Sequence, residues 1–264
     1  MLQGKNLFEA VAAHSGPAAF WWLGQHQFII KLGRDVILID PYLDPHPERR
    51  VAPLFKPEDA AGVVNIVCCT HEHGDHMDPK AIPGLAQSTN AVFVAPRAHA
   101  GLIQSMGVKE DRLVTLNDGE SVTIGDVTIH GIKAQHEFFD RTADGLFPYL
   151  GYLVEGAGKA VYHAGDTLWW EGLQERLSRR PLDVAMVPIN GRDARRYAAG
   201  CSGCMTYQEA ADLVGGLEVG MTVPAHYDMF AFNAEDVALF VDYMKVKYPQ
   251  HQVWAGAPAQ GVSF

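Results

Sequence analysis

The sequence predicts an α/β fold built from layers of strands and helices. Short apolar runs rich in β-branched and aromatic residues are typical of strands, and longer amphipathic runs are typical of helices. Both kinds occur along the 264-residue chain, and in each part of it strand-loop-helix units follow a group of strands. No linker-like composition separates the parts. The sequence therefore predicts one domain, residues 1–264, with two pseudo-symmetric halves at about 1–145 and 146–264.

The first third of the chain is rich in predicted strands. It begins with the runs AAFWWLG (18–24), QFIIKLG (27–33) and DVILID (35–40), with a tight hairpin turn at Gly33-Arg34-Asp35. Five prolines make residues 41–59 a long irregular loop, and loops of this length often form the rim of a site. The continuous apolar run VVNIVCCT (63–70) is typical of a strand buried on both faces. Asp78-Pro79 then predicts the start of a helix.

Strands and helices alternate in the rest of the chain. AVFVAP (91–96) predicts a strand, with a helix following near 97–106. Two strand pairs come next, in the runs SVTIG, VTIHGIKA, LGYLVEG and KAVYHAG. The last part contains a buried strand, a helix that ends at glycines, a further strand and an amphipathic helix, in the runs PLDVAMVPI, TYQEAADLVGGL, MTVPAH and AEDVALFVDYMKVKY.

The composition argues against several classes of protein. A formal net charge of −10 gives no general attraction to a nucleic acid backbone, so we expect no long nucleic acid partner. No apolar run approaches the roughly 20 residues that span a bilayer, and the N-terminus lacks the apolar segment of a signal peptide. Four cysteines, two of them adjacent, do not make a disulfide framework. We expect a cytoplasmic protein that acts on a small-molecule substrate, without a membrane, and a homo-oligomer is allowed.

The segment CCTHEHGDHMDP (68–79) is the strongest functional signal, because it crowds histidines and acidic residues behind an apolar strand. In an extended segment His71 and His73 point the same way, since side chains alternate. Gly74 then lets the backbone turn, so that Asp75 and His76 can face a second point nearby. Neutral imidazole and carboxylate are the ligands that borderline divalent metals prefer. The alternative is a polar surface loop, but the pairing of ligands favours a site for two metals.

Three further candidate ligands lie at the ends of predicted strands. His136 follows VTIHGIKA, Asp166 lies in YHAGDT, and His226 ends MTVPAH. His163 lies three residues before Asp166, a position that suits a partner of a ligand better than a ligand. The other histidines, His26 among them, have no such placement, and we expect structural or surface roles for them.

These motifs together resemble the metallo-β-lactamase superfamily. LIDPYL, YHAGDT, PINGRD and HYDMF are similar to the branch that contains L-ascorbate-6-phosphate lactonase. The resemblance implies a four-layer αββα sandwich, the metallo-β-lactamase fold, with two divalent metal ions per subunit, either Zn²⁺ or Mn²⁺, at one edge of the two sheets. It implies that one metal is held by His71, His73 and His136, that the other is held by Asp75, His76 and His226, and that Asp166 bridges them.

The expected function is that of a binuclear metal-dependent hydrolase. A metal-bridging hydroxide would attack the substrate, with Asp75 and Asp166 orienting it as catalytic residues. The expected substrate is a lactone or ester of a small anionic molecule, including a phosphorylated one. A phosphodiesterase of small or cyclic phosphodiesters and a non-catalytic metal-binding scaffold are the alternatives. Cys201 and Cys204 form a C-x-x-C pair, which can be a redox or metal motif or a glycine-flanked loop.

Several further residues are candidates for the surroundings of the metals. We expect Tyr42, Asn190 and Arg192 to bind substrate, with Arg192 as the anchor for an anionic group. The competing interpretation is that Arg192 pairs internally with a carboxylate and serves loop structure. Asp228 adjoins His226, and we expect it to hold a histidine in its metal-binding tautomer.

Overall fold

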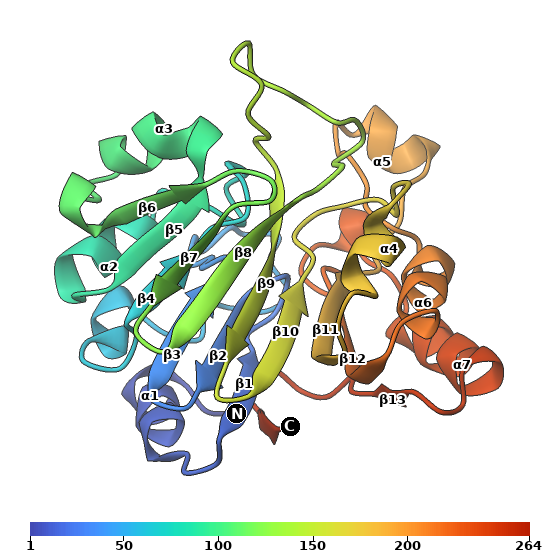
Figure 1. Cartoon of the computed structure of the whole chain (residues 1–264), viewed down its shortest axis with the longest axis horizontal. Coiled ribbons are helices and arrows are strands. Elements are labelled where there is room, and N and C mark those ends of the chain that lie inside the picture. The colour runs from blue at the N-terminus through green and yellow to red at the C-terminus, as the bar shows by residue number, and fades with distance from the viewer.

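The computed structural model describes residues 1–264 and has four layers. Two seven-stranded sheets face each other, and helices cover the outer face of each (Figure 1). This arrangement confirms the predicted αββα sandwich.

The first sheet has the strand order β14-β1-β2-β3-β4-β5-β6. β14 (Gly261–Ser263), β1 (Ala18–Trp22), β2 (Phe28–Leu32) and β3 (Asp35–Ile39) are antiparallel neighbours. β4 (Ile66–Cys68), β5 (Val92–Pro96) and β6 (Leu113–Leu116) continue the sheet in parallel from β3. The helices beside this sheet are α1 (Gly4–Ala13), α2 (Ala81–Ser88) and α3 (Ala100–Ser105).

The second sheet has the order β13-β12-β11-β10-β9-β8-β7 and repeats the order of antiparallel and parallel pairing, although its outer strand β7 directly precedes β8 whereas β14 comes from the end of the chain. β7 (Ser121–Ile124), β8 (Val127–Lys133), β9 (Leu150–Gly156) and β10 (Lys159–His163) are antiparallel neighbours. β11 (Leu182–Pro188), β12 (Val219–Ala225) and β13 (Gln252–Val253) continue in parallel from β10. The helices of this half are α4 (Leu173–Leu177), α5 (Ala194–Ala198), α6 (Tyr207–Gly215) and α7 (Val237–Lys247).

Alternation of side chains along the first strands builds two apolar layers. In β1, Phe20 and Trp22 face the second sheet, whereas Ala19 and Trp21 face the helices of their own half. Lys31 is the polar exception in β2 and is only 8% exposed. Its ammonium group donates to three carbonyls at the end of α1, those of Val11, Ala12 and His14, at 3.0, 3.0 and 2.7 Å. The Val11 carbonyl also accepts from the backbone N–H of His14 at 3.3 Å, whereas the lysine satisfies the carbonyls of Ala12 and His14, which the end of the helix leaves without a backbone donor.

The helix predicted to start at Asp78-Pro79 begins later, at Ala81. The Asp78 carboxylate accepts from the backbone N–H of Lys80 at 2.7 Å but also from those of Leu43 and Asp44, at 2.6 and 2.9 Å. Asp78 therefore joins the loop after β3 to the start of α2, and this shared role delays the helix. None of the helices is long and apolar enough to cross a lipid bilayer.

The carboxyl ends of β3 and β4 lie at one edge of the first sheet, and those of β8, β10, β11 and β12 at one edge of the second, because within each sheet these strands run in parallel or are related by an even number of antiparallel steps. Contact between the segments that follow, such as His76 after β4 with Asp166 after β10, shows that the two edges adjoin. The segments that follow these strands carry the predicted ligands. The topology thus brings residues from both sheets to one place.

Candidate metal centre

The loop after β4 carries four of the candidate ligands. It turns back at His73, whose carbonyl accepts from the backbone N–H groups of His76 and Met77 at 2.9 and 2.8 Å. Met77 is fully buried in the apolar layer beneath α2 and anchors this turn. His71 and His76 are also fully buried, so their rings are fixed by packing as well as by hydrogen bonds.

The structure brings His71, His73 and His136 together as one group. Nε2 of His71 lies 3.0 Å from Nδ1 of His73. His136 follows β8, and one ring nitrogen from each of the three histidines lies within 4.8 Å of the other two. The ring of Tyr149 packs against all three, at centroid distances of 5.2, 5.9 and 5.3 Å.

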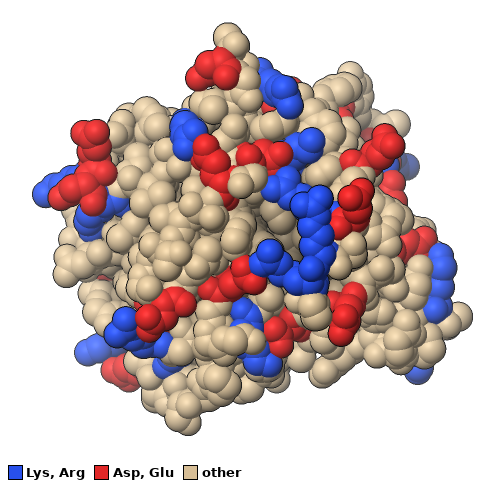
Figure 2. Space-filling view, viewed as in Figure 1, with Lys and Arg blue, Asp and Glu red and all other residues tan.

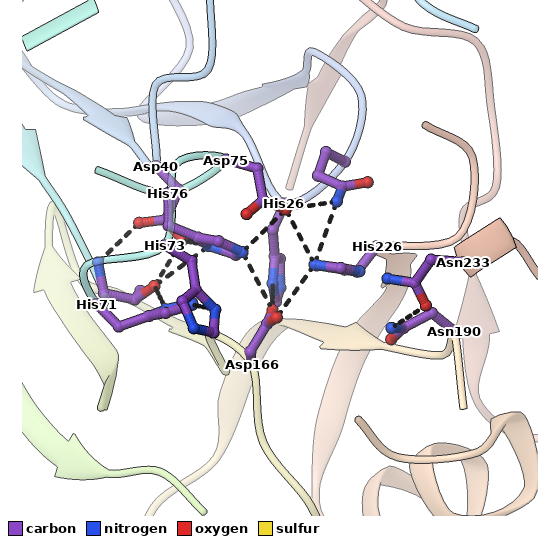
Figure 3. Close-up of polar contacts among 12 residues, drawn as sticks. His26, Asp40, His71, His73, Asp75, His76, Asp166, Asn190, His226 and Asn233 are labelled. Carbon is purple, nitrogen blue, oxygen red and sulfur yellow. Dashed lines mark hydrogen bonds and ion pairs between the residues drawn. The ribbon is translucent and has the colours of Figure 1, made fainter. Parts of the chain in front are cut away.

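A second group is formed by Asp75, His76 and His226 (Figure 3). Oδ2 of Asp75 lies 3.6 Å from Nε2 of His76 and 3.5 Å from Nε2 of His226. The rings of His76 and His226 are stacked, with centroids 5.5 Å apart.

Asp166 lies between the two groups. Its Oδ1 is 3.4 Å from Nε2 of His76, and its Oδ2 is 3.1 Å from Nε2 of His226. Oδ2 is also 3.8 Å from Nε2 of His136, which belongs to the first group. The carboxylate therefore contacts residues of both groups, as a bridging ligand would have to do.

Charges within the cluster shift its titration strongly. Burial alone would lower the pKa of His76, but the carboxylates of Asp166, Asp75 and Asp40 raise it well above its usual value. Burial likewise opposes the charge of His226, yet Asp166 and Asp75 raise its pKa to about 10. Burial opposes ionisation of Asp166 too, but His226 and His76 hold its pKa well below the usual range. The pKa of His71 is lowered by burial and then by His76.

Asp40, at the end of β3, fixes the proton positions on two histidines. Its Oδ2 is 2.7 Å from Nδ1 of His76, and a carboxylate can only accept, so His76 donates and keeps its Nε2 lone pair free. The Thr70 hydroxyl donates to the same oxygen at 2.8 Å, and it must then accept from Nδ1 of His71, 3.0 Å away. In the neutral, metal-binding form of both rings, the Nε2 atoms are therefore free of protons and face the cluster. Asp40 was not among the predicted site residues.

Two more residues of the site were missed, Gln25 and His26 in the turn between β1 and β2. The amide of Gln25 donates to Oδ2 of Asp75 at 2.7 Å and lies 3.2 Å from Nε2 of His226. His26, which we expected to have a structural or surface role, is fully buried with Nδ1 3.4 Å from Oδ1 of Asp166. The only sequence signal was a run of three polar residues, 25–27, between the apolar residues of β1 and β2. The contacts of Gln25 with Asp75 and His226 span 50 and 201 residues, and that of His26 with Asp166 spans 140, so local pattern could not reveal them.

Gln25 is held in a strained backbone conformation. Its φ is 52°, in the left-handed region that a non-glycine residue rarely adopts. Its carbonyl accepts from Nε1 of Trp22 and from the backbone N–H of His226, each at 3.0 Å. Its own N–H donates to Oδ1 of Asp228 at 2.9 Å. These bonds fix the residue, and strain of this kind is frequent at functional sites.

The predicted supporting residues take part, although not as predicted. Asp228 makes no hydrogen bond to a histidine, which corrects that expectation; because it holds the backbone of Gln25, it acts on the site indirectly. Nε2 of His163 donates to the carbonyl of His26 at 2.9 Å, and its ring packs 4.2 Å from that of His26. Burial lowers the pKa of His163 to about 3. His163 therefore supports the turn that carries Gln25 and His26 and contacts none of the predicted ligands by a hydrogen bond.

A cavity of about 500 Å³ opens onto the cluster. Tyr42 lines it, as predicted, together with Phe230, Phe232 and the segment 199–202. Arg192 does not line it, and this placement corrects the expectation of an anion anchor. The Arg192 guanidinium forms a bidentate pair with Glu209, at 2.6 and 2.7 Å, so the competing interpretation of internal pairing describes it.

Asn190 also lies outside the cavity wall. It is fully buried, and its amide donates to Oδ1 of Asn233 at 2.9 Å, so it supports a residue of the wall rather than forming one. The two cysteines of the C-x-x-C pair are both free thiols. Cys201 lines the cavity, and the buried Cys204 lies within 4.8 Å of ligand atoms of His136 and Asp166.

The residues present fit a divalent metal pair by the chemistry of their donors. Imidazole nitrogens and carboxylate oxygens are the usual ligands of Zn²⁺ and Mn²⁺. Nε2 of His76 is buried, free of a proton in the neutral ring, and without a hydrogen-bond partner. A buried nitrogen in that state is costly unless a ligand occupies it.

Comparison with known proteins identifies relatives. Residues 35–227 match the family described as the β-lactamase superfamily domain. The chain is 32% identical over 225 residues to a UPF0173 metal-dependent hydrolase of Rubrobacter xylanophilus, covering 82% of this chain and 84% of that protein. It is 30% identical to a UPF0173 protein of Pyrococcus furiosus, covering 80% and 83%.

Solved structures give the same result for the fold. The chain is similar to Igni18, a metallo hydrolase from Ignicoccus hospitalis, with a TM-score of 0.74, 22% identity and coverage of 94% of this chain and 98% of that one. It is also similar to an isothiocyanate hydrolase from Delia radicum gut bacteria, with a TM-score of 0.72, 20% identity and coverage of 93% and 99%. At these identities the likeness concerns the fold alone.

Proposed function

The chain belongs to the β-lactamase superfamily, among relatives described as UPF0173 metal-dependent hydrolases, and from this premise we propose that it hydrolyses a lactone or ester at a binuclear metal centre. The observation that carries the proposal is Asp166, whose two oxygens contact both groups of candidate ligands. A single-metal site would not need a carboxylate in that position.

The proposed ligand sets follow the two groups. His71, His73 and His136 would hold one cation, Asp75, His76 and His226 would hold the other, and Asp166 would be shared. Bound there, a pair of Zn²⁺ or Mn²⁺ ions lowers the pKa of water enough to supply hydroxide near neutral pH and polarises the oxygen that becomes negative.

The protein's own groups would then position the reaction. Hydrolysis adds the hydroxyl group of water to the acyl carbon and its remaining proton to the departing alcohol oxygen. Asp75 and Asp166 each have a second oxygen that can orient the attacking group. The amide of Gln25, fixed by three backbone contacts, lies beside Asp75 and can donate to negative charge that develops there.

Phosphodiester hydrolysis is the less favoured activity. Neither lysine nor arginine lines the cavity, so a phosphate would have no anchor apart from the metal ions. On the face shown in Figure 2, Lys and Arg form a band that is interleaved with acidic residues. Ion pairs such as Arg176 with Asp118 and Lys159 with Asp183 neutralise individual cations of the chain, which argues against a basic groove for a polynucleotide.

The test is metal analysis and a substrate panel on the same preparation. Protein purified without added metal is stripped with a chelator, saturated with Zn²⁺ or Mn²⁺, and assayed on lactones, p-nitrophenyl esters and bis(p-nitrophenyl) phosphate. Two metals per chain and turnover of lactones or esters are expected. His71→Ala should abolish turnover while the chain stays folded. One metal at saturation would contradict the binuclear centre, and turnover of the phosphodiester alone would replace the proposed activity.

A further inference from the structure

We infer that the part of the substrate that lies against the cavity wall carries an apolar group and no negative charge. This inference rests on the proposed function, since it describes the substrate of the same site. It departs from the anionic substrate that the sequence suggested. Three properties of the cavity wall carry it: the placement of cations, one free carboxylate and a pair of aromatic rings.

No arginine lines the cavity, and Arg49, Arg196 and Arg192 each bind groups of the chain itself. Arg49 packs over the ring of Tyr42, with Cζ 4.2 Å from the centroid, and donates to the carbonyls of Asp44 and Val51 at 2.8 and 2.9 Å. Arg196 contacts the carboxylate of Asp193 and donates to the carbonyl of Ala234 at 2.6 Å. Together with the Arg192–Glu209 pair, these contacts leave no guanidinium facing the cavity.

The wall instead presents a free negative charge. Asp44 lines the cavity, and its carboxylate makes no hydrogen bond or ion pair within the chain. Asp78 also lines it, but its oxygens accept from three backbone N–H groups and are engaged. Away from the proposed metal ions, an anionic substituent against this wall would meet Asp44 with no lysine or arginine lining the cavity to compensate it, and such like-charge contact disfavours binding.

Aromatic rings supply the apolar part of the wall. Phe230 and Phe232 are stacked, with centroids 5.5 Å apart and an interplanar angle of 27°. Tyr42 adjoins Phe230 at 6.3 Å. Phe232 is 50% exposed although it is a large apolar side chain, and it lies at the cavity. Exposed aromatic surface beside a polar centre is typical of a site that buries an apolar part of its ligand.

The experiment compares three p-nitrophenyl esters of matched acyl length: one that ends in a methyl group, one in a trimethylammonium group and one in a carboxylate. The metal-loaded full chain should give kcat/KM at least tenfold higher on the first two than on the third. Asp44→Asn should raise kcat/KM for the carboxylate ester about fivefold relative to kcat/KM for the methyl ester. Phe232→Ala should raise KM for the methyl ester, whereas Leu239→Ala, at a similarly exposed position on α7 outside this cavity, should not.

Binding is measured separately from turnover, so that failure of the proposed hydrolase activity can be distinguished from failure of the inferred charge preference. Calorimetry with the corresponding non-hydrolysable amides should show a lower Kd for the neutral and cationic compounds than for the carboxylate compound. Asp44→Asn should reduce this difference in Kd. If no ester is turned over, the proposed function fails, and the binding order still decides the charge preference. Preferred turnover or binding of the carboxylate compound, unaffected by Asp44→Asn, would overturn the inference.

Discussion

Replacing Asp40 by asparagine should weaken metal binding more than the loss of one hydrogen bond would suggest. In the native chain Oδ2 of Asp40 accepts from Nδ1 of His76 at 2.7 Å and from the Thr70 hydroxyl at 2.8 Å. Oδ1 accepts from the Thr70 backbone N–H at 2.8 Å, so an asparagine must keep its oxygen there and place its NH₂ group where Oδ2 was.

That NH₂ group would reverse the direction of a chain of hydrogen bonds. It donates to Nδ1 of His76, which forces the proton of that ring onto Nε2. It also donates to the Thr70 hydroxyl, which then donates to Nδ1 of His71, 3.0 Å away. Both rings would carry a proton on the nitrogen that should bind metal. One ligand of each proposed metal is affected.

The magnitude follows from two disturbed ligands. Loss of one supporting contact typically lowers metal affinity about 10- to 100-fold. Each site should therefore lose about 10- to 100-fold in affinity, or about 1.4–2.7 kcal/mol, and the two sites together on the order of 100- to 10,000-fold, or about 2.7–5.5 kcal/mol. Chelator competition with Zn²⁺ at pH 7.5 measures it directly, and thermal unfolding of the metal-free proteins shows whether the fold survives.

Asp35→Asn is the matched control. Asp35 begins the same strand, is 2% exposed and accepts from Asn65 and from the backbone N–H of Asp126, at 2.5 and 2.8 Å. Its replacement should lower stability without changing metal affinity. An Asp40→Asn protein that binds Zn²⁺ within threefold of the native chain would refute the tautomer argument.

Three further predictions test other parts of the site. The raised pKa values of His76 and His226 keep both rings protonated in the metal-free chain at pH 7, so Zn²⁺ should displace protons and bind more tightly as pH rises toward about 10. Calorimetry in two buffers of different ionisation enthalpy counts the protons released on binding. Release of no protons would contradict the assignment of these histidines as ligands. Arg192→Ala should lower the free energy of unfolding by about 1 kcal/mol, because the partly exposed ion pair with Glu209 is lost. It should change kcat/KM equally for anionic and neutral esters. A selective loss of kcat/KM on the anionic ester would instead support Arg192 as the anchor of an anionic substrate group. Gln25→Gly should lower kcat about tenfold, because the side-chain amide is removed, and should leave stability unchanged, because glycine readily adopts a φ of 52°. An unchanged kcat would show that the role of Gln25 is purely structural.

The sequence could predict the elements and the positions of the candidate ligands because both depend on local pattern. Strand periodicity located β1, β2 and β3, and the ends of strands located His136 and His226. The sequence could not predict the direction in which a side chain points beyond the end of a strand. Arg192 does follow β11, as predicted, but Glu209 on α6 captures its guanidinium, and the phase of that helix relative to the strand could not be read from spacing.

The supporting residues could not be predicted because their partners are distant in the chain. The bond from Gln25 to Asp228 spans 203 residues, and the contact of His26 with Asp166 spans 140. Asp40 lay in a quoted motif, but its role depends on Thr70 and on the ring orientation of His76. Such contacts follow from how the sheets pack, which no single stretch of sequence encodes.

The pairing of β14 with β1 has a consequence for biosynthesis. Phe20 of β1 pairs with Val262 of β14, about 240 residues later in the chain. At about 5–20 residues per second, a ribosome needs on the order of 10–50 seconds to make that stretch. Throughout this interval the edge of β1 is open, and an open apolar edge can pair with a neighbouring nascent chain. Polysomes translating this message would therefore be the place where aggregation competes most strongly with folding, and a chaperone that covers β1 at that stage would raise the yield.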